Sequence, residues 1–446
     1  MLKKILIANR GEIAVRIVRA CAEMGIRSAA IYTEPDRFSL HVKRADEAYN
    51  VGADPLEGYL NPRKLVALAV ETGCDGFHPG YGFLSENAEL AEICAQRGIT
   101  FIGPSAEVIR RMGDKTEARR AMVAAGVPVT PGTEDNLADV EEAVTVAAGI
   151  GYPVMLKATS GGGGRGIRRC DSEAELARNY ERVISEATKA FGNADVFMEK
   201  CIVNPKHIEV QVLADSHGNV VHLFERDCSI QRRNQKLIEI APSPQIGEEL
   251  RARLGELAVK AAKAVGYCSA GTVEFLLAGD DVYFMEMNTR IQVEHTITEE
   301  VIDFDLIKEQ IKLAAGEKIT GKEYIPRLHA IQCRINAENP FKDFIPSPGK
   351  ITDYHEPGGH GIRIDSHVYA GYTISPYYDS MISKLITVAQ TREEAITKMK
   401  RALSEYIIEG GGLHTTIPFH QQLMEDKSFN EGNFTTAFMD NFEIRE

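Results

Sequence analysis

Polar side chains occupy every second position between residues 284 and 295, in the segment FMEMNTRIQVEH. Alternate side chains of an extended chain share a face, so the spacing predicts a strand with one polar and one apolar face. The polar face would hold Glu286, Asn288, Arg290, Gln292 and Glu294. The apolar face would hold Met285, Met287, Ile291 and Val293. Two carboxylates, two amides and a guanidinium on one face suit the binding of an ion or a charged substrate.

A hairpin brings one of these carboxylates, Glu286, opposite a further one, Glu274. The runs TVEFLL and VYFMEMN flank AGDD, and a turn centred on Asp280 sets Glu274 opposite Glu286. Like charges directly opposite destabilise a sheet unless a cation lies between them. Asn288 adds a third oxygen, and this ligand set suits Mg²⁺ or Mn²⁺ with phosphates completing the shell. The alternative is a solvated face of the sheet.

A glycine run lies in KATSGGGGRG, residues 157–166. Consecutive glycines allow a backbone to approach a ligand and to point its N–H groups at an anion. The segment lacks the Gly-Lys-Ser/Thr of a P-loop, so a loop between two strands, acting as a flap over phosphates beside Lys157, is the prediction. A flexible surface hairpin is the alternative.

Further charged groups suggest an anionic substrate. The segment RDCSIQRRNQK, residues 226–236, carries four cations in a chain of net charge −13, and it is either an anion site or a solvated loop. In HIEVQVLAD, His207, Glu209 and Gln211 share a face, and FMEKCIV could recognise a purine edge. Arg290 could fix a planar oxyanion and Glu294 could remove its proton. Together these groups predict ATP with a metal ion.

Three regions must position these groups. Residues 1–113 alternate strand-like and helix-like segments, which predicts a parallel sheet, and ANRGEI lacks the glycine fingerprint of a nicotinamide or flavin site. Residues 114–130 are expected to be helical, residues from about 131 to 203 to form a small unit around the glycine run, and residues 204–320 to begin with two hairpins. Residues 327–446 are mainly short strands with a late helix. The predicted fold is therefore α/β and α+β.

The totals limit the class of protein. The 446 residues suggest roughly three domains by the prior of ~150 residues each. The net charge of −13 argues against a nucleic-acid partner, and no apolar run approaches the ~20 residues that span a membrane. The eight scattered cysteines predict reduced thiols in a cytoplasmic protein.

The motifs IANRGEIAVRI, HPGYGFLSEN, MGDK, KATSGGGGRGI, ERDCSIQRRNQK, FMEMNTRIQVEH, RINAE and YYDSMISKL, in this order, resemble the biotin carboxylase subunit or domain of the ATP-grasp superfamily. The resemblance runs from end to end. It implies that ATP phosphorylates bicarbonate to carboxyphosphate and that CO₂ then passes to N1′ of biotin on a carrier protein. It also implies a Rossmann-like first domain at 1–113, a central ATP-grasp domain at 114–320 with a lid at about 131–203, and a mainly β C-terminal domain at 327–446.

The resemblance assigns residues by motif. ATP would contact Lys115, Lys157, Gly163, Gly164, Glu199, Lys200, Ile202, His207, Asn234, Glu274 and Glu286. Glu274, Glu286 and Asn288 would hold Mg²⁺ or Mn²⁺. Bicarbonate would lie against Lys236, Arg290, Gln292 and Val293, with Glu294 as its base. Biotin would contact Tyr81, His207, Gln231 and Arg334, and Arg334 would stabilise its enolate-like oxygen. The catalytic set would be Arg290, Glu294, Lys236 and Arg334.

The chain departs from the pattern of the family at one position, and the resemblance also predicts its partners. Asn234 stands where many relatives have histidine, and asparagine cannot carry charge, so the affinity for ATP or its pH dependence would differ. No EAMKM-like attachment sequence occurs, which predicts that the carrier protein and the carboxyltransferase are separate partners. We also expect a homodimer, with Arg16, Arg19 and Glu23 at contact positions or simply on a solvated helix face.

The final carboxyl acceptor stays open at this point. Pyruvate or another 2-oxo acid, acetyl-CoA and propionyl-CoA are the candidates. The alternative functions are another ATP-grasp carboxylate ligase and a non-catalytic scaffold that binds nucleotide.

Overall fold

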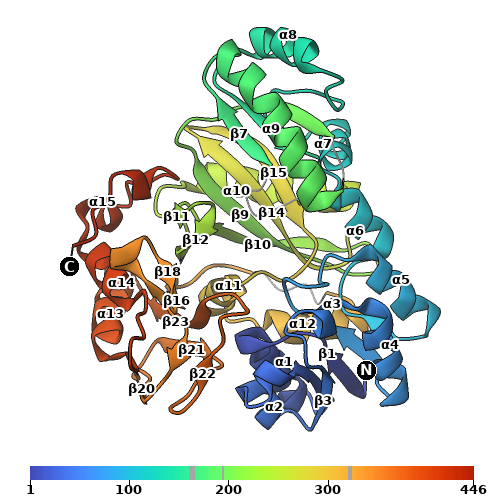
Figure 1. The fold of residues 1–446 in the computed structure, drawn as a ribbon, viewed down its shortest axis with the longest axis vertical. Coiled ribbons are helices and arrows are strands. Elements are labelled where there is room, and N and C mark those ends of the chain that lie inside the picture. The colour runs from blue at the N-terminus through green and yellow to red at the C-terminus, as the bar shows by residue number, and fades with distance from the viewer. Residues whose placement is uncertain (160–165, 193–194, 320–323, 446) are drawn as a thin grey trace.

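The computed structural model describes residues 1–159, 166–192, 195–319 and 324–445. Figure 1 shows three regions around a central sheet, with the N-terminal residues at the lower right, a lid at the top and the C-terminal residues at the left. The mixed α/β and α+β class predicted from the sequence is confirmed. Among the helices of the described residues, none combines the length and the apolar character that crossing a membrane requires.

The N-terminal region is a five-stranded parallel sheet in the order β3-β2-β1-β4-β5. Its strands are β1 Lys4–Ile7, β2 Arg27–Thr33, β3 Glu47–Gly52, β4 Gly76–His78 and β5 Thr100–Phe101. Helices α1 (Gly11–Glu23) and α12 (Leu306–Ala314) pack on one face, and α4 (Pro62–Glu71) and α5 (Ala88–Gln96) pack on the other. The strand order reverses between β1 and β4, so the loops that follow these two strands open at the same edge.

One antiparallel sheet of eight strands joins the central and C-terminal regions, in the order β15-β14-β9-β10-β13-β16-β23-β21. The strands are β9 Lys206–Ala214, β10 Val220–Asp227, β13 Ile238–Ala241, β14 Ser269–Ala278, β15 Asp281–Asn288, β16 His329–Asn336, β21 Ile362–Ser366 and β23 Met381–Ala389. Strand β13 pairs with β16. The two regions are therefore continuous through backbone hydrogen bonds rather than merely packed together.

The two faces of β9 follow the predicted alternation. Ile208, Val210 and Val212 pack against helix α10 (Glu248–Ala264) in a hydrophobic core. The alternate side chains of His207, Glu209 and Gln211 are buried among polar groups instead. A sheet with one apolar face and one buried polar face is suited to carrying a charged site.

The lid has its own small core, which packs α8 (Val140–Ile150) and α9 (Glu173–Phe191) on a three-stranded sheet. That sheet has the order β7-β6-β8, with β6 Val154–Ala158, β7 Ile167–Cys170 and β8 Val196–Lys200. Ser172 caps α9 by accepting a hydrogen bond from the backbone of Glu175, as the Ser-x-x-Glu spacing predicts. The predicted flap lies between β6 and β7, but its residues 160–165 are outside the described residues.

The C-terminal region adds short strands and the helices α13 (Arg392–Glu405) and α14 (Ile417–Glu425) around a large hydrophobic core. Helices α6 (Ala106–Gly113) and α7 (Lys115–Ala124) connect the N-terminal sheet to the central one, and α11 (His295–Ile302) follows β15.

The predicted strand 284–295 is wrong beyond residue 288. Strand β15 ends at Asn288, residues 289–294 form a turn, and α11 begins at His295. The prediction for Met285 is also wrong, because a shift in register after Glu274 leaves this residue in a bulge, 41% exposed. The period-two pattern of the sequence therefore describes a strand followed by a turn.

Candidate active site

A cleft of about 1330 Å³ opens between the lid, the N-terminal loops and the large sheet. Every predicted site residue within the described part of the chain lines this cleft. These residues are Tyr81, Lys115, Lys157, Glu199, Lys200, Ile202, His207, Gln231, Asn234, Lys236, Glu274, Glu286, Asn288, Arg290, Gln292, Val293, Glu294 and Arg334. Gly163 and Gly164 lie outside the described residues.

The carboxylates of Glu274 and Glu286 come from neighbouring strands, and their Cα atoms are direct partners across β14 and β15. Oε2 of Glu274 lies 2.7 Å from Nε2 of His207, and Oε1 accepts the side-chain amides of Asn288 at 2.8 Å and Gln292 at 2.6 Å. Burial by itself would raise the pKa of Glu274, but the charges of Lys236 and His207 outweigh it and hold this pKa well below its ordinary value.

The pKa of Glu286 is shifted in the direction opposite to that of Glu274. Burial and the charge of Glu274 both raise the pKa of Glu286 above its ordinary value. Two facing carboxylates with an amide oxygen on the same strand form a hard-oxygen donor set, and the repulsion that raises the pKa of Glu286 is the kind that a divalent cation relieves. The residues therefore fit a Mg²⁺ or Mn²⁺ ion.

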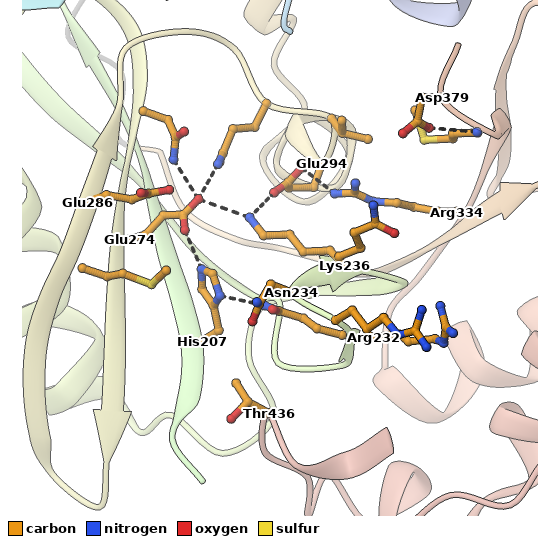
Figure 2. Close-up of a pocket in the computed structure, with 18 of the residues that line it drawn as sticks. His207, Arg232, Asn234, Lys236, Glu274, Glu286, Glu294, Arg334, Asp379 and Thr436 are labelled. Carbon is orange, nitrogen blue, oxygen red and sulfur yellow. Dashed lines mark hydrogen bonds and ion pairs between the residues drawn. The ribbon is translucent and has the colours of Figure 1, made fainter. Parts of the chain in front are cut away.

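Lys236 forms ion pairs with three buried carboxylates. Its Nζ atom lies 2.6 Å from Glu209, 3.2 Å from Glu274 and 2.6 Å from Glu294, and Figure 2 shows it between the last two. Burial alone would lower the pKa of Lys236, but these carboxylates raise it well above its ordinary value. The ammonium is therefore a fixed positive charge in the cleft at neutral pH.

Glu294 lies between two cations. Its second oxygen accepts a hydrogen bond of 3.0 Å from Arg334, whose Nε donates to Glu239 at 2.5 Å. Burial would raise the pKa of Glu294, yet Lys236 and Arg334 hold it well below its ordinary value. Glu294 is thus an ionised carboxylate with a buried, oriented side chain, although it comes from the turn before α11 and not from a strand.

The turn 289–294 is held from two sides. Arg290 donates to Asn288 Oδ1 at 3.0 Å and to Glu86 at 3.1 Å, and Glu86 belongs to the loop after β4 in the N-terminal region. The Gln292 side chain bridges Glu274 and Arg226, and the backbone oxygen of Val293 accepts a hydrogen bond from Lys384. The turn therefore places three residues in the lining of the cleft together with Glu294, although they do not lie on one strand. These residues are Arg290, Gln292 and Val293.

The predicted nucleotide residues lie along the lid and hinge. Lys157 pairs with Glu199, which also accepts a hydrogen bond from Arg119, and Lys200 donates to the backbone oxygen of Gly151 at 2.8 Å. Burial lowers the pKa of Lys115. Asn234 lies in the hairpin turn between β11 (Gln231–Arg232) and β12 (Gln235–Lys236) at φ +62°, a conformation that asparagine tolerates well.

The residues of the cation-rich segment 226–236 contact different parts of the protein. Arg232 and Arg233 pair with Asp343, which neutralises part of the charge. Gln231 donates to the backbone oxygen of Cys228 at 2.8 Å and lies 2.7 Å from Nδ1 of His207. Lys236 and Arg226 of this segment both bond to the buried carboxylate Glu209, so the segment is neither a simple anion site nor a plain solvated loop.

Sequence reasoning missed the role of Arg226, which is fully buried behind the cleft. Its Nε donates to Glu209 at 2.6 Å, and its other nitrogens donate to side-chain oxygens on three more elements. These acceptors are Gln211, Thr298, Thr272 and Gln292. All five guanidinium donors are therefore used, and the alternation that placed Glu209 and Gln211 on one face of β9 was the available signal.

Glu239 and Glu86 were missed as well. Glu239 is buried on β13, where it accepts hydrogen bonds from Arg334 and Gln332. Glu86 lies within the quoted motif HPGYGFLSEN, but nothing in its spacing indicates a contact with Arg290. Both contacts join segments far apart in the sequence.

The chain was compared with protein-family models, curated proteins and solved structures. Residues 1–109 match the model "Biotin carboxylase, N-terminal domain", and residues 332–441 match "Biotin carboxylase C-terminal domain". Residues 114–322 match "Carbamoyl-phosphate synthase L chain, ATP binding domain".

Curated relatives align over nearly the whole chain. Biotin carboxylase 1 of Bacillus subtilis is 55% identical, with 100% of this chain and 99% of the relative covered. A pyruvate carboxylase subunit of Methanothermobacter thermautotrophicus is 54% identical, with 99% and 90% covered. The 2-oxoglutarate carboxylase small subunit of Hydrogenobacter thermophilus is also 54% identical, with 99% and 93% covered.

Solved structures agree in fold. The biotin carboxylase domain dimer of Hydrogenobacter thermophilus 2-oxoglutarate carboxylase, in complex with MgADP, ADP and bicarbonate, superposes with a TM-score of 0.96 at 54% identity, covering 99% of this chain and 97% of that one. A biotin carboxylase complex from Campylobacter jejuni gives a TM-score of 0.96 at 49% identity, with 99% of each chain covered.

Proposed function

The chain belongs to the biotin carboxylase family, and from this premise we propose that it catalyses the ATP- and bicarbonate-dependent carboxylation of biotin on a separate carrier protein. This reaction is the first half-reaction of a multisubunit carboxylase. The observation that carries the proposal is the cluster in which Lys236 and Arg334 both hold Glu294, beside the facing carboxylates of Glu274 and Glu286. A base flanked by two cations suits a small oxyanion that must lose a proton.

We propose that the nucleotide lies between the lid and the large sheet. Lys115 and Lys157 would bind phosphate oxygens, Gly163 and Gly164 would cover them, and Glu199 to Ile202 with Asn234 and His207 would bind the remaining parts of ATP. Glu274, Glu286 and Asn288 would hold Mg²⁺ or Mn²⁺. The metal, when bound, neutralises charge on the phosphates.

Bicarbonate would lie next to Glu294. Lys236 and Arg290 supply positive charge, and Gln292 and the backbone of Val293 supply hydrogen bonds. Because the pKa of Glu294 is held well below its ordinary value, its carboxylate is ionised at neutral pH and available to take the proton from the bicarbonate hydroxyl. The bicarbonate oxygen that has lost its proton would then attack the terminal phosphorus of ATP, whose bond to the bridging oxygen breaks, so that ADP leaves and carboxyphosphate forms. Carboxyphosphate would separate into CO₂ and phosphate, the phosphate would accept the proton of biotin N1′, and N1′ would form its new bond to CO₂.

Biotin would lie at the Arg334 side of the cluster, with Tyr81, Gln231 and His207 around its ring. Arg334 keeps a fixed orientation because Glu239 holds its Nε atom, so a guanidinium nitrogen faces the cleft. We propose that this nitrogen stabilises the negative charge that develops on the ureido oxygen of biotin.

The partners in this proposal are a biotin carboxyl carrier protein and a carboxyltransferase subunit, and the chain itself would form a homodimer. Support comes from relatives that are named as subunits and from a related structure described as a dimer. Arg16 does not fit the predicted contact, because it is buried in ion pairs with Glu299 and Asp305 of its own chain, whereas Arg19 and Glu23 are exposed.

The acceptor and the location stay open. The relatives include pyruvate and 2-oxoglutarate carboxylase subunits as well as biotin carboxylases, and some of these are chloroplastic. Pyruvate, 2-oxoglutarate, acetyl-CoA and propionyl-CoA remain candidates for the acceptor, and the cytoplasmic location stays a prediction.

The test of the function is ATP hydrolysis by the purified chain with Mg²⁺ and free biotin, with bicarbonate added or rigorously removed. ADP release that requires bicarbonate and rises with biotin is the expected result. Release that is indifferent to bicarbonate would favour another ATP-grasp ligase. ATP binding without turnover at saturating bicarbonate would favour a non-catalytic scaffold.

Replacement of Arg334 by alanine is expected to slow biotin carboxylation more than bicarbonate-dependent ADP release, because this side chain would act on biotin and not on the phosphate. Carboxybiotin is measured with radiolabelled bicarbonate, and ADP release is measured in the same reaction mixture. Glu239→Gln, which leaves the arginine in place but weakens its support, should give a smaller change of the same kind. Equal losses of both rates in Arg334→Ala would contradict the assigned role.

A further inference from the structure

An ion pair at the wall of the cleft joins two motif residues to which the proposed mechanism gives no role. Glu12 lies in the first turn of α1, in the motif IANRGEIAVRI, and Lys384 lies in β23, in the motif YYDSMISKL. Lys384 is fully buried and Glu12 is 3% exposed. Their charged atoms are 3.0 Å apart, so two segments far apart in the sequence meet at this pair.

Each partner also holds a group beside the cleft. Nζ of Lys384 donates a hydrogen bond of 3.0 Å to the backbone oxygen of Val293, the residue between Gln292 and Glu294. Oε1 of Glu12 accepts a hydrogen bond from the hydroxyl of Tyr81. The pair thus connects the turn assigned to bicarbonate with the tyrosine assigned to biotin.

Stability is a poor explanation for this pair. Burying two charges carries a desolvation penalty, and replacing a buried ion pair with apolar groups of similar volume is often neutral or stabilising. Asp365, the other acid near Lys384 at 3.8 Å, is already paired with Arg363 at 2.9 Å. The contacts that set the Glu12–Lys384 pair apart are those to Val293 and Tyr81.

We propose that the Glu12–Lys384 ion pair positions the two substrates of the carboxylation relative to each other, by fixing Val293 on the bicarbonate side and Tyr81 on the biotin side. Lys384 lies behind the cleft, whereas Glu12 is among the residues that line it. Both are positioning residues, because each acts through a residue assigned to a substrate, Val293 for Lys384 and Tyr81 for Glu12. The inference rests on the proposed function. Transfer of CO₂ to biotin depends on this spacing, whereas cleavage of ATP depends on it less.

The test compares Lys384→Met with Lys398→Met as a matched control, because Lys398 also donates to a backbone oxygen of β23, that of Val388, away from the cleft. The readout is the ratio of carboxybiotin formed to ADP released, together with KM for bicarbonate and for ATP. For Lys384→Met we expect the ratio to fall about tenfold to a hundredfold, since a 1 Å misplacement can cost about 10²-fold. KM for bicarbonate should rise and KM for ATP should stay the same.

A double variant separates positioning from burial of charge. Glu12→Gln with Lys384→Met leaves no unpaired charge and keeps an acceptor for Tyr81, so it should recover the melting temperature but not the ratio. A wild-type ratio in Lys384→Met or in the double variant, an equal loss in Lys398→Met, or failure of both Lys384 variants to fold would overturn the proposal. Absence of bicarbonate-dependent ADP release in the wild type would instead overturn the proposed function.

Discussion

Glu294→Gln is expected to reduce bicarbonate-dependent ADP release by about 10²–10⁴-fold, the usual cost of losing a general base. The amide keeps the volume of the side chain and its ability to accept a hydrogen bond from Lys236 or Arg334, but it cannot take a proton. The affinity for ATP should be unchanged because no predicted phosphate contact involves Glu294. Steady-state kinetics with bicarbonate as the varied substrate and calorimetric titration with ATP measure the two quantities.

Glu239→Gln is the matched control for this experiment. Glu239 is also a buried carboxylate bonded to Arg334, but it does not line the cleft. If Glu294 acted only by holding Arg334, the two variants would lose similar activity. A much larger loss in Glu294→Gln identifies it as the base, and wild-type turnover in that variant would contradict the assignment.

The second large effect is expected on stability. Arg226→Met should lower the free energy of unfolding by about 3–5 kcal/mol, the usual cost of breaking a buried ion pair by removing one partner. Glu209 would keep Lys236 but lose the guanidinium at 2.6 Å, and four other side-chain oxygens would lose their donor. The chain has no tryptophan, so urea unfolding is followed by far-ultraviolet circular dichroism.

Two further variants show whether the effect comes from the buried charge. Arg401→Met removes an exposed i,i+4 pair with Glu405 and should change stability by no more than about 0.5 kcal/mol. Arg226→Met combined with Glu209→Gln should recover part of the loss, because no uncompensated carboxylate remains. A stability change in Arg226→Met as small as that of Arg401→Met would show that these hydrogen bonds contribute little.

The sequence by itself determined the features that depend on nearby residues. The alternation of helix and strand in residues 1–113 indicated a parallel sheet because each buried strand must be followed by a covering helix. The turn residues 279–280 indicated the hairpin of β14 and β15, but the register of this turn pairs Ala278 with Asp281, and only the bulge at Met285 sets Glu274 opposite Glu286. The motif resemblance identified the family, and with it every described residue that was expected in the cleft.

Only the tertiary structure decided how separate segments meet. Lys236, Glu294 and Arg334 come from β12, a turn and β16, and no spacing along the chain predicts their contacts at 2.6 and 3.0 Å. The same holds for the pairing of β13 with β16, which continues the central sheet into the C-terminal region. Such contacts depend on the global packing of the sheet and not on local propensity.

The turn after Asn288 shows most clearly why the sequence alone could not determine such contacts. Polar residues at alternate positions satisfied the pattern of a strand, but residues 289–294 are held by partners from other elements. Among these partners, Arg226 and Lys384 donate hydrogen bonds to the turn, and Glu86 accepts one from the backbone of Thr289. These partners belong to β10, β23 and the N-terminal loop, so the conformation of the turn is set by groups that are absent from the local sequence. Local patterns fix which side chains share an element, and long-range charge pairing fixes where that element ends.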